Sequence, residues 1–180
     1  MTLHIIFSAN VTETSVKKLM ALINTELQKK EEHFIIHISS PGGNVFWGIT
    51  AYNFLKGIEA KVETNNLGSA DSIATVIYCA GEQRYCSPHA RFMMHGVGVT
   101  LPQNVRVEEK QLDEKLKSLR KDTENIAGVL AQNTGKSEDE ITDAIYQGTV
   151  LNPEEAKEYG LVHEIREKLY GKNDRVITIS

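Results

Sequence analysis

The run from Asn65 to Gly81 constrains the fold of this chain more than any other. It reads NNLGSADSIATVIYCAG, so a polar, glycine-containing segment passes directly into an apolar one. The pattern predicts a turn over 65–69 and a buried helix that begins beside Ser72. The first N–H groups of a helix lack helical acceptors and the helix dipole favours negative charge there, so an oxyanion beside Ser72 would be stabilised. Simple capping of the helix by Ser72 or Asp71 is the alternative.

Length, charge and cysteine content narrow the class of protein. The 180 residues suit one compact unit with a full core, so we expect a single domain over 1–180. A net charge of −4 gives no basic footprint, and we expect no nucleic-acid partner. We also expect no membrane span and no secretory leader, because the apolar runs are short and the N-terminus lacks the leader pattern. Cys79 and Cys86 are too few for a disulfide framework, which favours a cytoplasmic location.

Strand and helix patterns alternate along the first half of the chain. Short apolar strands are predicted at 3–7, 33–39, 61–65, 84–86 and 91–95. Helices with apolar residues at helical spacing follow three of them, beginning near Thr12, Val45 and Ser72. The strand at 33–39 is continuously apolar, as expected in a sheet that is covered on both faces. The alternation predicts an α/β fold with mostly parallel strands.

A long amphipathic helix is predicted over 107–131, after a polar connector at 100–106. Its apolar stripe consists of Leu112, Leu116, Leu119, Ile126 and Leu130. The stripe is longer than one small domain readily covers, so we expect a partner surface and a homo-oligomer. Two short helices are predicted after it, one capped by Ser137 with Glu140 and one that begins near Pro153, and a strand is predicted at 161–165.

Three elements together suit serine hydrolysis, which needs a nucleophilic hydroxyl, a base and fixed donors for the oxyanion. Ser72 supplies the hydroxyl, His95 lies at the end of an apolar strand, and the pair Gly42-Gly43 offers backbone N–H groups that no side chain obstructs. Each feature alone is more often structural. The other histidines have no metal-ligand grouping, and we expect neither a metal nor another cofactor.

With the glycine pair, Ser72 and His95 in this order and at this spacing, the chain resembles the proteolytic subunit of the Clp protease, the ClpP family within the crotonase-like fold. The resemblance covers most of the chain. The motifs that carry it are Ser40-Pro41-Gly42-Gly43, Gly68-Ser69-Ala70-Asp71-Ser72, 83–88, 91–95, 133–137 and 153–162.

The resemblance implies a fold, a site and an assembly. The fold is a repeated β-β-α superhelix with a projecting handle over roughly 97–134. Ser72 would be the nucleophile and His95 the base, and the N–H groups of Gly43 and Ile73 would form the oxyanion hole. The assembly would be a homo-oligomeric ring of six or seven subunits, with stacking of rings through the handle helix. Peptides or unfolded proteins would be the substrates.

The chain departs from the family pattern in three places. The family's spacing puts the orienting aspartate of the triad at Gly148, which has no side chain, so Asp143, Asn152 or a backbone carbonyl near Gly148 are left as partners for His95. The small residue before the serine is Asp71 here, and its carboxylate could repel an oxyanion or point away. The sequence also starts at the family's first core strand, without the segment that helps to dock an ATPase.

Three functions follow as hypotheses. The first is a ClpP-like serine endopeptidase with a Ser–His dyad and low activity, which cleaves peptides or small unfolded proteins without ATP or with weak coupling to an ATPase. The second is a catalytically silent assembly or regulatory subunit, for which Gly148 and Asp71 argue. The third is an acyl-CoA enzyme on the same fold, in which the Gly42-Gly43 region would stabilise an enolate; Ser72 and His95 argue against it, because that chemistry needs no serine nucleophile.

Overall fold

The described strands form one eight-stranded sheet in the computed structural model, which describes residues 2–100 and 106–180. The strands are β1 (Thr2–Phe7), β2 (His33–Ser40), β3 (Lys61–Asp71), β4 (Gln83–Cys86), β5 (Arg91–Met93), β6 (Val150–Leu151), β7 (Glu164–Ile165) and β8 (Arg175–Ile179). The helices are α1 (Glu13–Gln28), α2 (Val45–Gly57), α3 (Ile73–Tyr78), α4 (Glu109–Thr134), α5 (Glu138–Gln147) and α6 (Pro153–Glu158).

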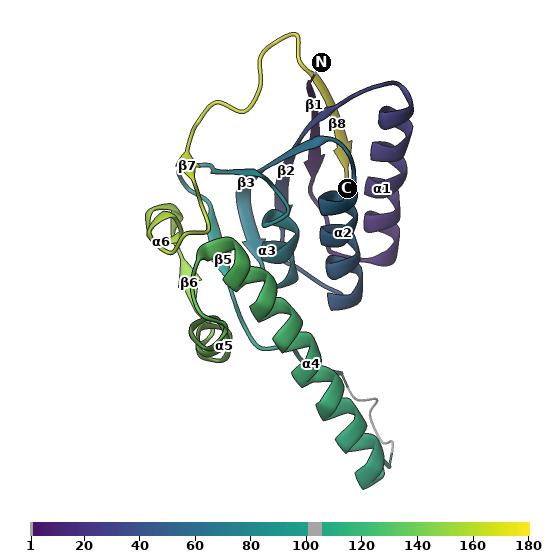
Figure 1. The fold of residues 1–180 in the computed structure, drawn as a ribbon, viewed down its shortest axis with the longest axis vertical. Coiled ribbons are helices and arrows are strands. Elements are labelled where there is room, and N and C mark those ends of the chain that lie inside the picture. Colours follow the sequence, from purple (N-terminus) through teal and green to yellow (C-terminus); the bar gives the residue numbers. More distant parts are fainter. Residues whose placement is uncertain (1, 101–105) are drawn as a thin grey trace.

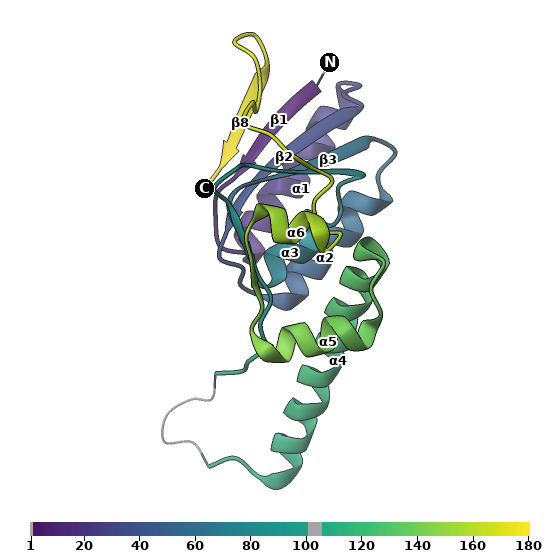
Figure 2. The same cartoon turned by 90° about the vertical axis from the view of Figure 1, so that its left-hand side faces the viewer.

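The sheet has the order β6-β5-β3-β2-β1-β8, with β4 beside β3 and β7 beside β4. Every pairing is parallel except that between β5 and β6. Figures 1 and 2 show α1, α2 and α3 packed along one side of the sheet, while α4 projects away from it. The predicted α/β fold with mostly parallel strands is confirmed.

The core forms where these helices cover the sheet. Alternate residues of β1, namely Leu3, Ile5 and Phe7, are completely buried, as the period of a strand requires. Gly48 of α2 lies directly against Ile73 of α3, since a Cβ added at Gly48 would be 2.1 Å from the Cγ1 atom of Ile73. This close approach seats α3, and with it Ser72, against the core.

The predicted turn over 65–69 is wrong, because these residues continue β3 as far as Asp71. β3 pairs first with β4 and then with β5, so its edge stays covered along most of its length. Between the two pairings the buried Asn66 side chain donates to the Arg91 carbonyl at 2.7 Å and accepts from the Gly68 N–H at 3.2 Å. The amide thus takes the place of ladder hydrogen bonds, which keeps a polar sequence extended.

The C-terminal part of the chain differs from the prediction in its strands. The strand expected at 161–165 is reduced to β7, and the apolar tail at 176–179, for which no element was predicted, lies in β8 beside β1. Arg175 of β8 donates to both carboxylate oxygens of the buried Glu26 on α1, at 2.5 and 2.8 Å. These hydrogen bonds lower the pKa of Glu26 and fix β8 against α1.

The connector predicted at 100–106 lies largely outside the described residues. The long helix predicted over 107–131 is observed as α4. Its N-terminal half exposes the leucines of the stripe, with exposed fractions of 47% for Leu112 and 45% for Leu116, whereas Ile126 and Leu130 are buried. The buried Arg84 holds the C-terminal end, because its guanidinium donates to the carbonyls of residues 133, 160 and 161. One half of α4 is therefore core and the other half projects.

Two histidines pack against each other on neighbouring strands. The rings of His4 on β1 and His37 on β2 are stacked with centroids 5.2 Å apart, and the His4 Nδ1 and His37 Nε2 atoms are 2.9 Å apart. Tyr170 contacts both rings. Burial lowers the pKa of His37 to about 4, and the nearby His4 and Arg166 act in the same direction. His37 is thus a neutral structural residue at pH 7.

This pKa makes the fold sensitive to acid. The unfolded chain binds a proton at His37 near pH 6.5, whereas the folded chain does so only near pH 4, so the free energy of unfolding should fall as the pH drops through that window. We expect His37 to account for about 3 kcal/mol of the loss between pH 6.5 and 4. Urea unfolding of the native chain and of His37→Gln at several pH values measures this. Equal pH slopes for the two proteins would contradict the assignment.

Candidate active site

Ser72 occupies the junction between β3 and α3. Its φ of 56° and ψ of −129° lie in a region that residues with a side chain rarely adopt. Its N–H donates to the Met93 carbonyl at 2.6 Å, which ties the junction to β5. Among the described residues the Ser72 hydroxyl makes no hydrogen bond and does not cap α3. The strained junction therefore carries a hydroxyl that forms no structural hydrogen bond with the described residues.

Asp71 does not cap α3 either. It is buried, and its Oδ2 atom accepts a hydrogen bond from the Arg91 guanidinium at 2.8 Å. The carboxylate next to the predicted nucleophile is therefore paired with a cation, which reduces the repulsion that it would exert on an oxyanion.

The Gly42-Gly43 loop lies against the Ser72 junction. A Cβ added at Gly42, where φ is 93°, would be 2.8 Å from the Cβ of Ser72. The next residue, Gly43, forms a parallel bridge with Val11, in which the Val11 N–H donates to Gly42 and the Val11 carbonyl accepts from Asn44, both at 2.8 Å. In such a bridge the N–H of Gly43 itself points away from Val11. It has no acceptor among the described residues, so it can act as a donor.

The conformation of Gly43 admits no side chain. Its φ is 149°, and an added Cβ would be 2.3 Å from the Val11 carbonyl oxygen. We therefore expect Gly43→Ala to lower the free energy of unfolding by about 3 kcal/mol or more. Gly135→Ala is the matched control, because Gly135 also has a positive φ but nothing within 4 Å of an added Cβ, and it should cost about 1 kcal/mol. Urea unfolding compares the two, and equal losses would contradict the steric argument.

Ile73 supplies the second predicted donor. As the first residue of α3 it has an N–H without a helical acceptor. A Cβ added at Gly42 would lie 3.4 Å from this nitrogen, so the glycine loop and the start of α3 meet around Ser72.

His95 follows β5 and is exposed. Its Nδ1 atom is 2.9 Å from the Gly96 carbonyl oxygen. A carbonyl only accepts, so this contact requires a proton on Nδ1 and leaves Nε2 as the basic nitrogen. Ser72 and His95 line one small cavity, together with Met94, Ile126, Leu130 and Ile145. No hydrogen bond joins the two side chains within the described part of the chain, and such bonds are often long before substrate binds.

Gly148 lies close to the strand that leads to His95. It ends α5 in the left-handed conformation, with φ 70° and ψ 51°. The carbonyl of the following Thr149 accepts from the Met94 N–H at 2.8 Å. The position at which the family pattern expects an aspartate therefore lies beside the chain segment that carries His95, the predicted base, and glycine gives it no side chain.

The two side chains suggested as replacements for that aspartate, Asn152 and Asp143, form no hydrogen bond with His95 in the described part of the chain. Asn152 caps α6 and accepts from the Glu155 N–H at 2.9 Å. Asp143 lines a separate pocket together with Lys136 and Tyr159. Among the described residues the His95 side chain forms a hydrogen bond only with the Gly96 carbonyl, and none with a backbone carbonyl near Gly148, which was the third suggested partner.

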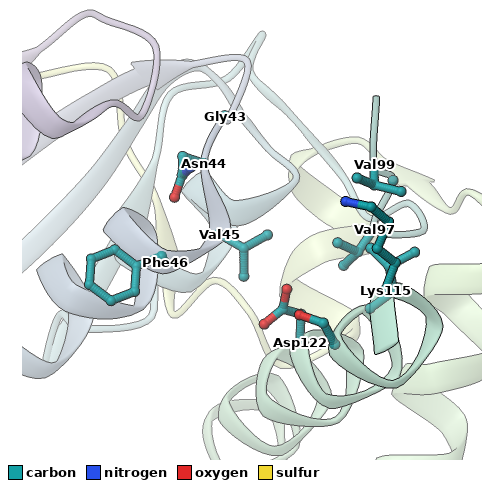
Figure 3. Close-up of a pocket in the computed structure, with 11 residues that line it drawn as sticks. Gly43, Asn44, Val45, Phe46, Val97, Val99, Lys115 and Asp122 are labelled. Carbon is teal, nitrogen blue, oxygen red and sulfur yellow. The ribbon is translucent and has the colours of Figure 1, made fainter. Parts of the chain in front are cut away.

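A pocket of about 420 Å³ adjoins Gly43 (Figure 3). Its walls come from three separate segments, which are 43–46, 97–99 and the helix α4 with Lys115, Ser118, Leu119 and Asp122. Sequence reasoning missed this pocket, because it joins residues far apart in the chain. One signal was present, since Asp122 falls between Leu119 and Ile126 at the spacing of the apolar stripe.

Other kinds of reactive group are scarce in the described residues. They contain no group of three or more His, Cys, Asp or Glu side chains that could hold a metal ion. Cys79 and Cys86 are buried free thiols, and burial raises the pKa of each to about 12, so neither is a thiolate at neutral pH. Within the same residues, no helix combines the length and the apolar character needed to cross a bilayer.

Comparison with known proteins gives consistent matches. The sequence model of the family described as Clp protease matches residues 1–169. The ATP-dependent Clp protease proteolytic subunit 1 of Salinibacter ruber is 32% identical over 149 residues, which are 80% of this chain and 61% of that relative's length. The structure of a ClpP1 point mutant from Listeria monocytogenes matches with a TM-score of 0.83 at 24% identity, over 92% of this chain and 91% of that chain, which supports the fold.

Proposed function

Because this chain belongs to the Clp protease family, we propose that it is a serine endopeptidase that cleaves peptides or small unfolded proteins. Members of the family are serine peptidases and form ring oligomers. The observation that carries the proposal is the contact of the Gly42-Gly43 loop with Ser72, in a site whose small cavity also includes His95.

The proposed reaction uses four groups. The Ser72 hydroxyl attacks the scissile carbonyl while His95 Nε2 takes its proton, and the N–H groups of Gly43 and Ile73 bind the oxyanion. His95 then gives the proton to the leaving amine, and water hydrolyses the acyl-enzyme by the reverse transfers. None of these steps uses a nucleotide, so short peptides should be cleaved without ATP.

The rate should be low for the family. A carbonyl holds the histidine tautomer but carries no charge to stabilise the imidazolium, and loss of the carboxylate from a serine triad costs about 10⁴-fold in kcat. The proposed enzyme is therefore a slow Ser–His dyad.

Labelling with a fluorophosphonate tests the proposal directly. The probe should modify Ser72, and the modification should disappear in His95→Ala but persist in His89→Ala, which removes an exposed histidine outside the site. Mass spectrometry of the labelled peptide identifies the residue. A folded protein that takes up no label would overturn the peptidase assignment.

A catalytically silent family member is the second candidate. Two observations favour it, namely Gly148 in place of a carboxylate and the lack of a Ser72–His95 hydrogen bond among the described residues. The absence of labelling in a well-folded assembly would select this function.

We further propose that the chain forms a homo-oligomeric ring of six or seven subunits and that the exposed half of α4 contacts a second ring. The support is the projection of α4 with Leu112 and Leu116 on its surface. The single domain over 1–180 and the cytoplasmic location stay predictions from the sequence.

Leu116→Glu should separate stacked rings, because it places a charge in the apolar contact between helices. Lys117→Glu is the matched control, since Lys117 lies on the same turn and is 70% exposed. We expect a smaller sedimentation coefficient for Leu116→Glu alone, with unchanged circular dichroism. Sedimentation identical to the native protein would remove α4 from the contact.

A further inference from the structure

The pocket beside Gly43 combines apolar walls with polar groups, which include one acidic side chain, Asp122, and one basic side chain, Lys115. Val45 and Phe46 form one side and Val97 and Val99 the other, while Leu119 contributes from α4. Figure 3 shows Asp122 on the floor, beneath Val45. The volume of about 420 Å³ is within the range of about 300–1,000 Å³ for pockets that bind small ligands. A long side chain that is apolar along its stem and charged at its tip would match these walls.

The Asp122 carboxylate has no partner among the described residues. It forms no hydrogen bond and no ion pair there, although every other acidic residue in the middle of α4, namely Asp113, Glu114 and Glu124, has a lysine within 4.0 Å. Asp122 is also half-buried, and burial raises its pKa. A charge that has lost water without gaining a partner is stabilised by any cation that enters the pocket.

Lys115 also lines the pocket and must be weighed against Asp122. It is exposed and comes from the same helix as Asp122, and Figure 3 shows its side chain beside Val97 and Val99, whereas Asp122 lies beneath Val45. An exposed ammonium keeps its water and its field is screened, whereas the half-buried carboxylate is screened less. The Asp122 charge therefore has the larger effect on which side chain the pocket prefers, and the Lys115 charge reduces the preference for a cation.

We propose that this pocket selects substrates with a lysine or arginine side chain, through an ion pair with Asp122. The proposal rests on the proposed peptidase function. The pocket includes Gly43, the predicted oxyanion donor, whereas Ser72 and His95 line a separate small cavity. Because Gly43 belongs to both the pocket and the predicted oxyanion hole, we assign the basic side chain to the residue whose carbonyl Ser72 attacks. Asp122 is then a specificity residue that takes no part in the proton transfers.

Cleavage of three peptides that differ only at that residue tests the proposal. With lysine, methionine or glutamate there, kcat/KM should be about tenfold or more higher for lysine than for methionine, and lowest for glutamate. Asp122→Asn should bring the lysine to methionine ratio close to one, while Asp113→Asn, on the exposed part of α4, should keep it. Lys115→Gln should increase the ratio. Cleavage that depends on Ser72 but shows no preference for lysine would overturn the inference and leave the peptidase assignment intact.

Binding separates a failure of this inference from a failure of the proposed function. The Ser72→Ala protein should bind a fluorescent peptide with C-terminal lysine more tightly than the matching methionine peptide, and Asp122→Asn in that background should remove the difference. If no peptide is cleaved but lysine is preferred in binding, the selectivity stands without the peptidase function. Equal anisotropy titrations for the two peptides would overturn the selectivity.

Discussion

Replacing Ser72 with alanine is expected to reduce peptide hydrolysis to the uncatalysed background, a loss of at least about 1,000-fold in kcat/KM. The oxyanion donors alone cannot open the scissile bond at a comparable rate, because no other hydroxyl takes the place of the nucleophile. The free energy of unfolding should change by less than about 1 kcal/mol, because the Ser72 hydroxyl makes no capping hydrogen bond. The strain of the positive φ should also be similar for serine and alanine, since both have a Cβ. Peptide kinetics and urea unfolding measure the two effects.

The matched control for this variant is Ser69→Ala on the same strand. The Ser69 hydroxyl makes a long hydrogen bond of 3.4 Å to the Ser40 carbonyl, outside the proposed chemistry. Its loss should leave kcat/KM within about twofold. Undiminished hydrolysis by Ser72→Ala would exclude Ser72 as the nucleophile.

Gly148→Asp is expected to raise kcat by about 100-fold. An aspartate at this position would add the negative charge that stabilises the imidazolium of His95, an effect worth up to about 10⁴-fold in a complete triad. The backbone permits the change, because aspartate tolerates the left-handed conformation and nothing lies within 4 Å of a Cβ added there. Steady-state kinetics with one peptide over a range of pH measures the gain.

Two controls isolate the charge in this experiment. Gly148→Asn has nearly the same shape and the same tolerance of positive φ but no charge, and it should give a much smaller gain. Gly135→Asp places a carboxylate at the left-handed cap of α4 and should give none. An equal gain from Gly148→Asn and Gly148→Asp would show that electrostatic support of His95 is not the cause.

The sequence predicts the alternating part of the fold well, because hydrophobic periodicity and caps are local signals. The capping box of Ser137 with Glu140 and the start of α2 after Asn44 lie where these signals place them. The prediction from sequence fails at 65–69, where the polar residues are typical of a turn. The Asn66 side chain and two successive partner strands keep this segment in the extended conformation of β3. Such long-range support has no local signature.

The candidate site also contains residues that the sequence predicts and contacts that it does not. Ser72, His95, Gly43 and Ile73 could be proposed from motifs, and the structure brings Ser72, His95 and the glycine loop together. The partners that adjust the site could not be foreseen, since Arg91 reaches Asp71 across neighbouring strands and the Gly96 carbonyl meets His95 through the local path of the backbone. The identity of the residue that orients a base depends on distances that spacing alone does not give.

The division of α4 into a packed half and a projecting half separates two properties of the protein. The groups proposed for bond cleavage are fixed to the sheet and to α3, whereas Asp122 is carried by a helix that makes few contacts over much of its length. Mutations on the exposed turns of such a helix usually cost little stability. If the proposed function holds, selection could thus retune substrate preference through α4 while the proposed catalytic groups stayed unchanged, and the same helix would be the place to begin redesigning the cleavage specificity.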